Sequence, residues 1–96
     1  MSFSRSTGFI SSNTGNQALS NIPTPAYLVG LSIITGANTC NVKIGDGSNA
    51  VGKTLATLYV AANSEGSFEY TPIRADNGLW LEVAGGNGSN IIVRYQ

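Results

Sequence analysis

From residue 26 onward, apolar and polar residues alternate over short runs, and turn-forming residues separate these runs. Alternation with a period of two residues is typical of strands that turn one face toward a core. The glycine, asparagine, aspartate and serine residues between the runs are the usual residues of tight turns. Six runs have this character. They cover residues 27–35, 40–46, 54–61, 67–73, 79–84 and 90–95.

These runs predict six strands and no helix, so the expected fold class is all-β. The run 54–61 is ambiguous, because it has apolar residues on both faces and its periodicity also allows a helix. Its threonine, tyrosine and valine residues favour a strand. The run 67–73 contains Pro72. Because proline has no backbone N–H to donate, we expect this strand to end there, at a sheet edge or a bend.

The alternation also predicts which side chains face the core. In the run 79–84 it places Leu79 and Leu81 on one face and Trp80 on the opposite face. In the run 27–35 the odd positions form the more apolar face, and the even positions are mixed. These odd positions are Tyr27, Val29, Leu31 and Ile33.

The first 25 residues are mostly serine, threonine, asparagine, glycine and glutamine, with only isolated apolar residues. Pro23 and Pro25 favour an extended backbone and disfavour an independent helix. We therefore expect residues 1–25 to form an extended N-terminal arm, which could add one or two strands, and residues 26–96 to form one β-sandwich domain. An antiparallel sandwich of jelly-roll type is the simplest way to close six strands around one core.

A chain of 96 residues has room for one core, and its five basic and five acidic residues cancel. The basic residues are scattered singly, whereas a nucleic-acid-binding protein is expected to carry a basic stripe. No apolar run is long enough to cross a bilayer, and the polar first residues do not resemble a signal peptide. We expect no nucleic-acid or membrane partner, and synthesis in a cytoplasm.

One stretch matches a nucleotide-binding motif. Gly47-Ser-Asn-Ala-Val-Gly-Lys-Thr54 fits G-x-x-x-x-G-K-T, in which backbone amides cradle phosphates and the threonine holds magnesium. That motif works between a buried parallel strand and a helix, in an α/β domain larger than this one. Here the following residues predict a strand, so a Gly-rich hairpin loop accounts for the same letters. We expect no nucleotide cofactor.

Other catalytic and metal-binding arrangements are weaker. The chain has no histidine, which excludes an ordinary Ser-His-Asp or Cys-His centre, and Cys40 is its only cysteine. Acidic residues on a β surface are more often solubilising than catalytic, and Asp-Gly-Ser-Asn at 46–49 is an ordinary turn sequence as well as a possible calcium ligand set. We expect no catalytic residues, no metal and no enzyme activity. The acidic residues considered were Glu65, Glu69 and Glu82.

Trp80 has three interpretations, because an outward tryptophan is consistent with a subunit contact, with a core covered on both faces, or with a sugar-binding site. The same argument applies to Ile92 and Leu28. The isolated apolar residues of the arm are further candidates for protein contacts. The complete set of contact candidates is Phe3, Phe9, Ile10, Leu19, Trp80 and Ile92.

The order of motifs from residue 26 onward resembles a group of small bacteriophage virion proteins, in which a Lys/Tyr-Ile-x-Asp-Gly turn follows a strand. The stretches that carry the resemblance cover residues 27–33, 42–47, 51–58, 68–73, 77–83 and 92–95. The resemblance implies a β-sandwich in a phage particle, such as a capsid decoration (cement) protein that sits as a homotrimer over junctions of the major capsid protein. In such proteins the arm extends onto neighbours, where its apolar residues would anchor it.

The expected function is therefore that of a non-enzymatic virion protein, made in the host cytoplasm, that stabilises the head. One alternative is a tail, neck or fibre component. Another is a small carbohydrate-binding module, in which Trp80 and exposed tyrosines would contact sugars. The tyrosines are Tyr27, Tyr59, Tyr70 and Tyr95.

Overall fold

The computed structural model describes residues 5–12, 16–19, 22, 24–47, 53–85 and 88–96, and these contain strands and no α-helix. All six predicted strands are present, each within two residues of its expected ends, which confirms the all-β class. Three two-residue strands precede them. The strands are β1 (Arg5–Ser6), β2 (Ile10–Ser11), β3 (Gln17–Ala18), β4 (Ala26–Ile34), β5 (Cys40–Asp46), β6 (Lys53–Val60), β7 (Glu65–Ala75), β8 (Leu79–Gly85) and β9 (Asn90–Tyr95).

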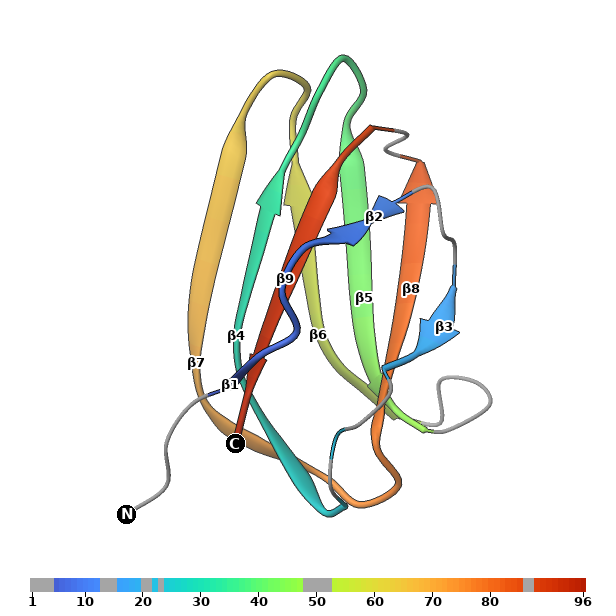
Figure 1. The fold of residues 1–96 in the computed structure, drawn as a ribbon, viewed down its shortest axis with the longest axis vertical. Coiled ribbons are helices and arrows are strands. Elements are labelled where there is room, and N and C mark those ends of the chain that lie inside the picture. The colour runs from blue at the N-terminus through green and yellow to red at the C-terminus, as the bar shows by residue number, and fades with distance from the viewer. Residues whose placement is uncertain (1–4, 13–15, 20–21, 23, 48–52, 86–87) are drawn as a thin grey trace.

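The strands form two antiparallel sheets that face each other (Figure 1). Sheet A has the order β1-β9-β4-β7, and β2 also pairs with β9. Sheet B has the order β3-β8-β5-β6. Side chains from both sheets are fully buried in one cluster, as expected for a sandwich whose inner faces pack together. The largest of them are Leu28, Leu31, Ile33, Ile44, Leu79, Leu81 and Ile91.

The described residues before β4 lie along one side of this sandwich. β1 and β2 pair with β9 of sheet A, and β3 pairs with β8 of sheet B. The segment therefore crosses from one sheet to the other, and its short strands cover the outer edges of β9 and β8. An arm that reaches beyond the domain is not seen in residues 5–12 and 16–19, while residues 1–4 and Pro23 lie outside the described part of the chain.

β4 contains a bulge at Val29 that corrects the predicted core face. Leu28 pairs with Tyr95 and Gly30 pairs with Arg94, so one residue of β4 has no counterpart on β9. An extra residue in one strand reverses which positions point inward on either side of it. Leu31 and Ile33 are buried as predicted, but Leu28 rather than Tyr27 faces the core before the bulge.

β7 does not end at Pro72, so the predicted end of the strand was wrong, although β7 does lie at an edge of sheet A. The strand continues to Ala75 and pairs again with β4 from Ile73 onward. Between the pairs Gly30–Glu69 and Leu28–Ile73, three residues of β7 lie opposite the single residue Val29. Pro72 occupies this irregular step of an edge strand, where the missing N–H costs no ladder hydrogen bond.

Candidate binding surfaces

Two of the predicted contact residues, Trp80 and Ile92, lie on the main strands, on the outer faces of sheet B and sheet A respectively. Trp80 is half-buried on the outer face of sheet B, because Leu79 and Leu81 on either side of it are buried in the core. Its cross-strand partners are Gly45 of β5 and Ala18 of β3, whose small side chains leave room for the indole. Ile92 is half-buried on the outer face of sheet A, where it pairs with Ser32.

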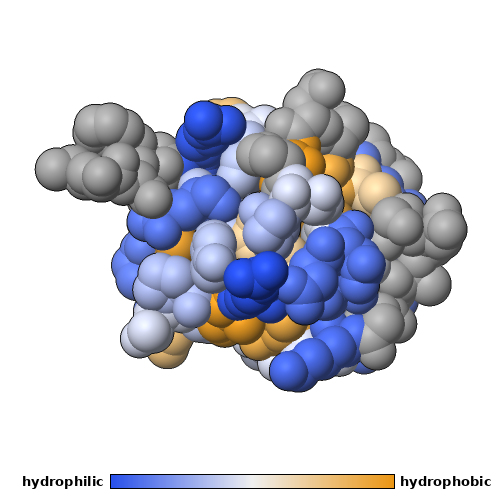
Figure 2. All heavy atoms as spheres, turned by 90° about the horizontal axis from the view of Figure 1, so that it is seen from below, coloured by the Kyte–Doolittle hydropathy of each residue, from blue (hydrophilic) through white to orange (hydrophobic). Residues whose placement is uncertain are grey.

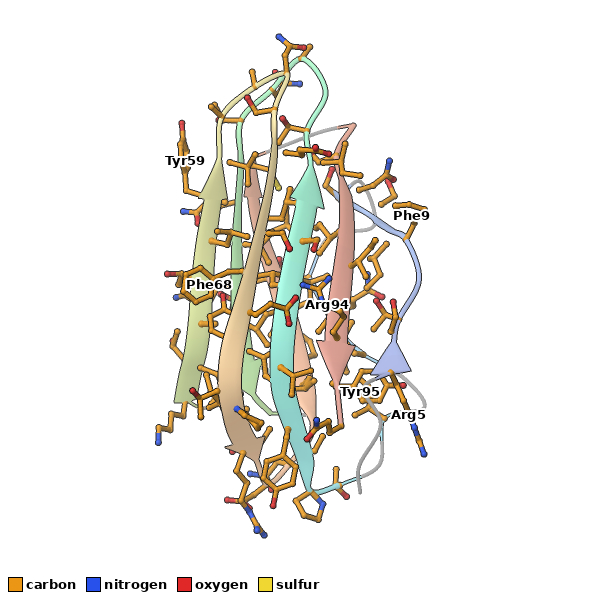
Figure 3. The ribbon with its side chains drawn as sticks, turned by 90° about the vertical axis from the view of Figure 1, so that its left-hand side faces the viewer. Arg5, Phe9, Tyr59, Phe68, Arg94 and Tyr95 are labelled. Carbon is orange, nitrogen blue, oxygen red and sulfur yellow. The ribbon has the colours of Figure 1, made fainter. Side chains whose placement is uncertain are left out.

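The arm candidates divide into two groups. Phe9 is the most exposed large apolar residue of those described, with 69% of its surface accessible, and it projects from the connection between β1 and β2 (Figure 3). Ile10 and Leu19 are half-buried and pack against the core, so most of their apolar surface is already covered within the chain. Phe3 lies outside the described residues.

A further apolar surface lies on the side opposite the N-terminal strands. In the described part of the chain, β6 pairs only with β5 and β7 pairs only with β4, so each is the free edge of its sheet. The two edges contact each other across the sandwich, and Figure 3 looks onto them. We call β6, β7 and the side chains between them the open side.

Phe68 is the main apolar group of the open side. Its pairing with Leu31 directs its ring toward the sandwich interior. Even so, 54% of its surface stays accessible, because β7 is the edge of sheet A in the part of the chain that the structure describes. The ring packs on Tyr70 with centroids 4.8 Å apart. Burial raises the pKa of the Tyr70 hydroxyl above its ordinary value. The ring reaches solvent because the strand order places β7 at the edge of sheet A.

The outer face of sheet B carries a polar groove of about 580 Å³. It runs over β6, β5 and β8, and the segment before β3 forms its far rim. Asn41 pairs across the strands with Tyr59 and Ala84, and Lys43 pairs with Thr57 and Glu82. The lining residues are Asn16, Asn41, Lys43, Thr57, Tyr59, Glu82, Val83 and Ala84.

The outer face of sheet A is organised around Arg94 of β9. Its guanidinium donates to the Ser32 hydroxyl at 2.7 Å and to a Glu69 carboxylate oxygen at 2.6 Å. The same group reaches the Ser67 hydroxyl at 3.3 Å. This cluster joins β9, β4 and β7 through side chains, in addition to their backbone hydrogen bonds. Glu69, one of the acidic residues considered above, therefore forms an ion pair with Arg94.

The residues that suggested nucleotide or calcium chemistry have structural roles where they are described. Thr54 lies in β6 opposite Gly45, so a strand and not a helix follows the glycine-rich motif, as predicted. Asp46 accepts hydrogen bonds from the backbone N–H groups of Asp76 and Asn77 at 3.2 and 2.8 Å. Residues 48–52 lie outside the described part of the chain.

Glu82 faces Lys43 at 3.9 Å across β8 and β5. Within the residues that the structure describes, no three histidine, cysteine, aspartate or glutamate side chains gather closely enough to hold a metal ion.

Cys40 is buried in the core, and burial raises the pKa of its thiol.

The end of the molecule that carries the turn after β7 is mainly polar. Figure 2 shows this end with hydrophilic residues over most of its described surface and hydrophobic residues only in separate patches. An apolar contact surface is therefore better provided by the sides of the sandwich than by this end.

A scan against models of protein families found no match to this chain, and a search of curated proteins found none either. No helix among the described residues is long and apolar enough to span a membrane. Function is therefore inferred from the surfaces described above.

Proposed function

We propose that this chain is a non-enzymatic structural protein of a virus particle, a capsid decoration protein that self-associates as a homotrimer and binds across subunits of the major capsid protein. The observation that carries the proposal is the open side, where two free strand edges flank the accessible ring of Phe68. Exposed aromatic rings at the centre of a patch are the residues that most often anchor protein contacts.

The contact on the open side would use side chains and not added strands. Free strand edges recruit further strands unless charged residues, proline or irregular steps protect them. β7 has all three devices, since Glu65 and Glu69 are charged and Pro72 lies in the irregular step opposite Val29. A second copy of the chain that packs on Phe68 would bury the ring without extending the sheet into an open-ended fibre.

The strand order supports a jelly-roll topology, which we include in the proposal. If β1 and β2 count as one edge strand, each sheet has four strands, and the chain changes sheet at almost every connection. Such an order is the one expected for two intertwined four-stranded Greek keys, which supports the proposed jelly roll. Jelly rolls are common among viral capsid proteins, which favours the virion assignment by analogy of fold.

The self-association is tested by light scattering coupled to size exclusion. We expect a mass about three times the 9.9 kDa of one chain. Phe68→Ser should shift the protein toward monomer, because it removes the accessible ring. Phe9→Ser is the matched control, since Phe9 is also an exposed phenylalanine but lies at the opposite edge of sheet A. A monomer at all concentrations, or equal effects of both variants, would contradict the proposed trimer contact.

The location is tested separately on particles produced from the genome that encodes this chain. An epitope-tagged chain should co-purify with heads after tails have been removed. Recovery with tails would instead favour the tail, neck or fibre alternative. Absence of the chain from both fractions would overturn the virion assignment.

A further inference from the structure

We propose that the groove on the outer face of sheet B binds a neutral sugar residue of a glycan. The strand registers show how the residues that line the groove are arranged. Asn41 and Ala84 are neighbours on β5 and β8 and form the floor. Tyr59 stands on one rim and Asn16 on the other, and Lys43 with Glu82 marks the end nearer Trp80.

Tyr59 provides the flat surface that a sugar ring needs. It belongs to β6, its side chain points away from the core, and 63% of its surface is accessible (Figure 3). One face of a pyranose ring presents C–H groups, which pack on an aromatic ring, while the ring edge presents hydroxyls. An exposed tyrosine beside polar side chains matches this division, because its ring is apolar and its hydroxyl is polar.

The polar residues of the groove suit hydroxyl groups. Asn41 and Thr57 each offer both donor and acceptor atoms, as a sugar hydroxyl does. Lys43 adds donors and Glu82 adds acceptors, and with their charges 3.9 Å apart the end of the groove is close to neutral overall. An anionic ligand would meet the Glu82 carboxylate and a cation would meet the Lys43 ammonium. A neutral, hydroxyl-rich ligand satisfies both.

The groove is also held in shape before any ligand arrives. β5 is an interior strand of sheet B, and Asn41 of the floor is paired on both sides, with Tyr59 of β6 and Ala84 of β8. On the far rim, the side-chain oxygen of Asn16 accepts the backbone N–H of Val83 at 2.9 Å, which fixes the amide beside β8. A volume of about 580 Å³ lies within the range of small-molecule sites. Preorganised polar groups reduce the ordering cost of binding.

Trp80 lies on the same outer face, two residues along β8 from Glu82. A glycan chain that leaves the groove past the Lys43–Glu82 pair would run toward the indole. Because Trp80 is the only tryptophan, its fluorescence reports on this face alone. The proposal does not depend on self-association or on a virion location.

The test is a titration of the full chain with neutral oligosaccharides of glucose, mannose, galactose, xylose and N-acetylglucosamine, monitored by tryptophan fluorescence and isothermal calorimetry. At least one should bind with a dissociation constant in the micromolar to millimolar range. Tyr59→Ala should weaken that binding at least tenfold, and Asn41→Ala should also weaken it. Phe68→Ala is the control, because it removes an exposed aromatic ring outside the groove and should leave affinity unchanged.

Several results would overturn the proposal. The first is that no neutral oligosaccharide binds at concentrations up to about 10 mM, which would exclude even weak dissociation constants. The second is that Tyr59→Ala leaves the affinity unchanged. The third is that only sulfated or phosphorylated glycans bind. Circular dichroism checks that each variant is folded. Because Tyr59 and Asn41 are exposed, their replacement should preserve the strand signal. A wild-type chain that binds sugar but is monomeric would contradict the trimer and support the groove.

Discussion

The guanidinium group of Arg94 lies directly over Gly30, and the two residues are cross-strand partners in β9 and β4. A Cβ atom on Gly30 would stand 2.6 Å from Arg94 Nε, closer than real side chains approach. The absence of a side chain at position 30 therefore allows Arg94 to lie flat across β4 and reach Glu69 of β7. In this position the Arg94 side chain keeps only 23% of its surface accessible.

Replacing Gly30 with alanine should destabilise the protein. The new methyl group would displace the Arg94 side chain and weaken its contacts with Ser32 and Glu69. The guanidinium is the end of a flexible side chain and can move aside, so the cost is mainly that of its lost hydrogen bonds. We expect the free energy of unfolding to fall by about 1 kcal/mol. Chemical denaturation followed by circular dichroism measures this change.

The matched control for Gly30→Ala is the same substitution in an Arg94→Ala background. Without the guanidinium the added methyl group has space, so the second substitution should cost less than it does in the wild type. Equal costs in both backgrounds would show that the clash with Arg94 is not the cause.

Loss of the Thr35 hydroxyl should destabilise the folded protein. This buried side chain follows β4, donates to the Ala61 carbonyl at 2.6 Å and accepts the Ser64 N–H at 2.9 Å, which ties the end of β4 to the β6–β7 turn. Thr35→Val keeps the shape and removes both hydrogen bonds, so we expect a loss of about 1–3 kcal/mol. Thr35→Ser keeps the hydroxyl and should retain most of the stability in the same denaturation assay. A harmless Thr35→Val would argue against this role.

Asp46 should stabilise the turn after β7. Its carboxylate accepts the backbone N–H groups of Asp76 and Asn77, so Asp46→Ala leaves two donors without this acceptor. By analogy with helix N-caps, we expect a cost of roughly 1 kcal/mol. Asp76→Ala is the control, because it keeps the backbone donor and removes only an exposed ion pair with Arg74. Thermal unfolding should show a lower melting temperature for Asp46→Ala and little change for Asp76→Ala.

Stability should decline at alkaline pH. Burial raises the pKa of Cys40 and of Tyr70 above their ordinary values of 9.0 and 10.0, so folding favours the neutral, protonated forms. This contribution is fully present below about pH 9 and is lost as pH rises through the folded-state values, because the unfolded chain releases these protons first. Guanidinium unfolding between pH 7 and 11 measures it. In Cys40→Ala and in Tyr70→Phe, the free energy of unfolding should decline less steeply with pH. Slopes equal to that of the wild type would show that these groups do not cause the decline.

The sequence by itself determined the all-β class, the six main strands and the outward direction of Trp80. These properties are local, because the alternation of side chains across a strand depends on the residues immediately along the chain. Turn residues such as Asp76, Asn77 and Gly78 mark the strand ends for the same reason. The sequence allowed one or two further strands in the polar first segment, but its weak apolar periodicity did not place them. β1 and β2 pair with the edge of β9, and β3 pairs with the edge of β8.

Only the tertiary structure decided which positions come together. The bulge at Val29 reverses the core face of β4, and the register of β4 with both β7 and β9 shifts there. The groove gathers Asn16, Asn41, Tyr59 and Glu82 from four separate segments, and the open side depends on β6 and β7 being edges. Strand order and register are set by the joint burial of both inner faces, a property of the whole chain that no local pattern contains.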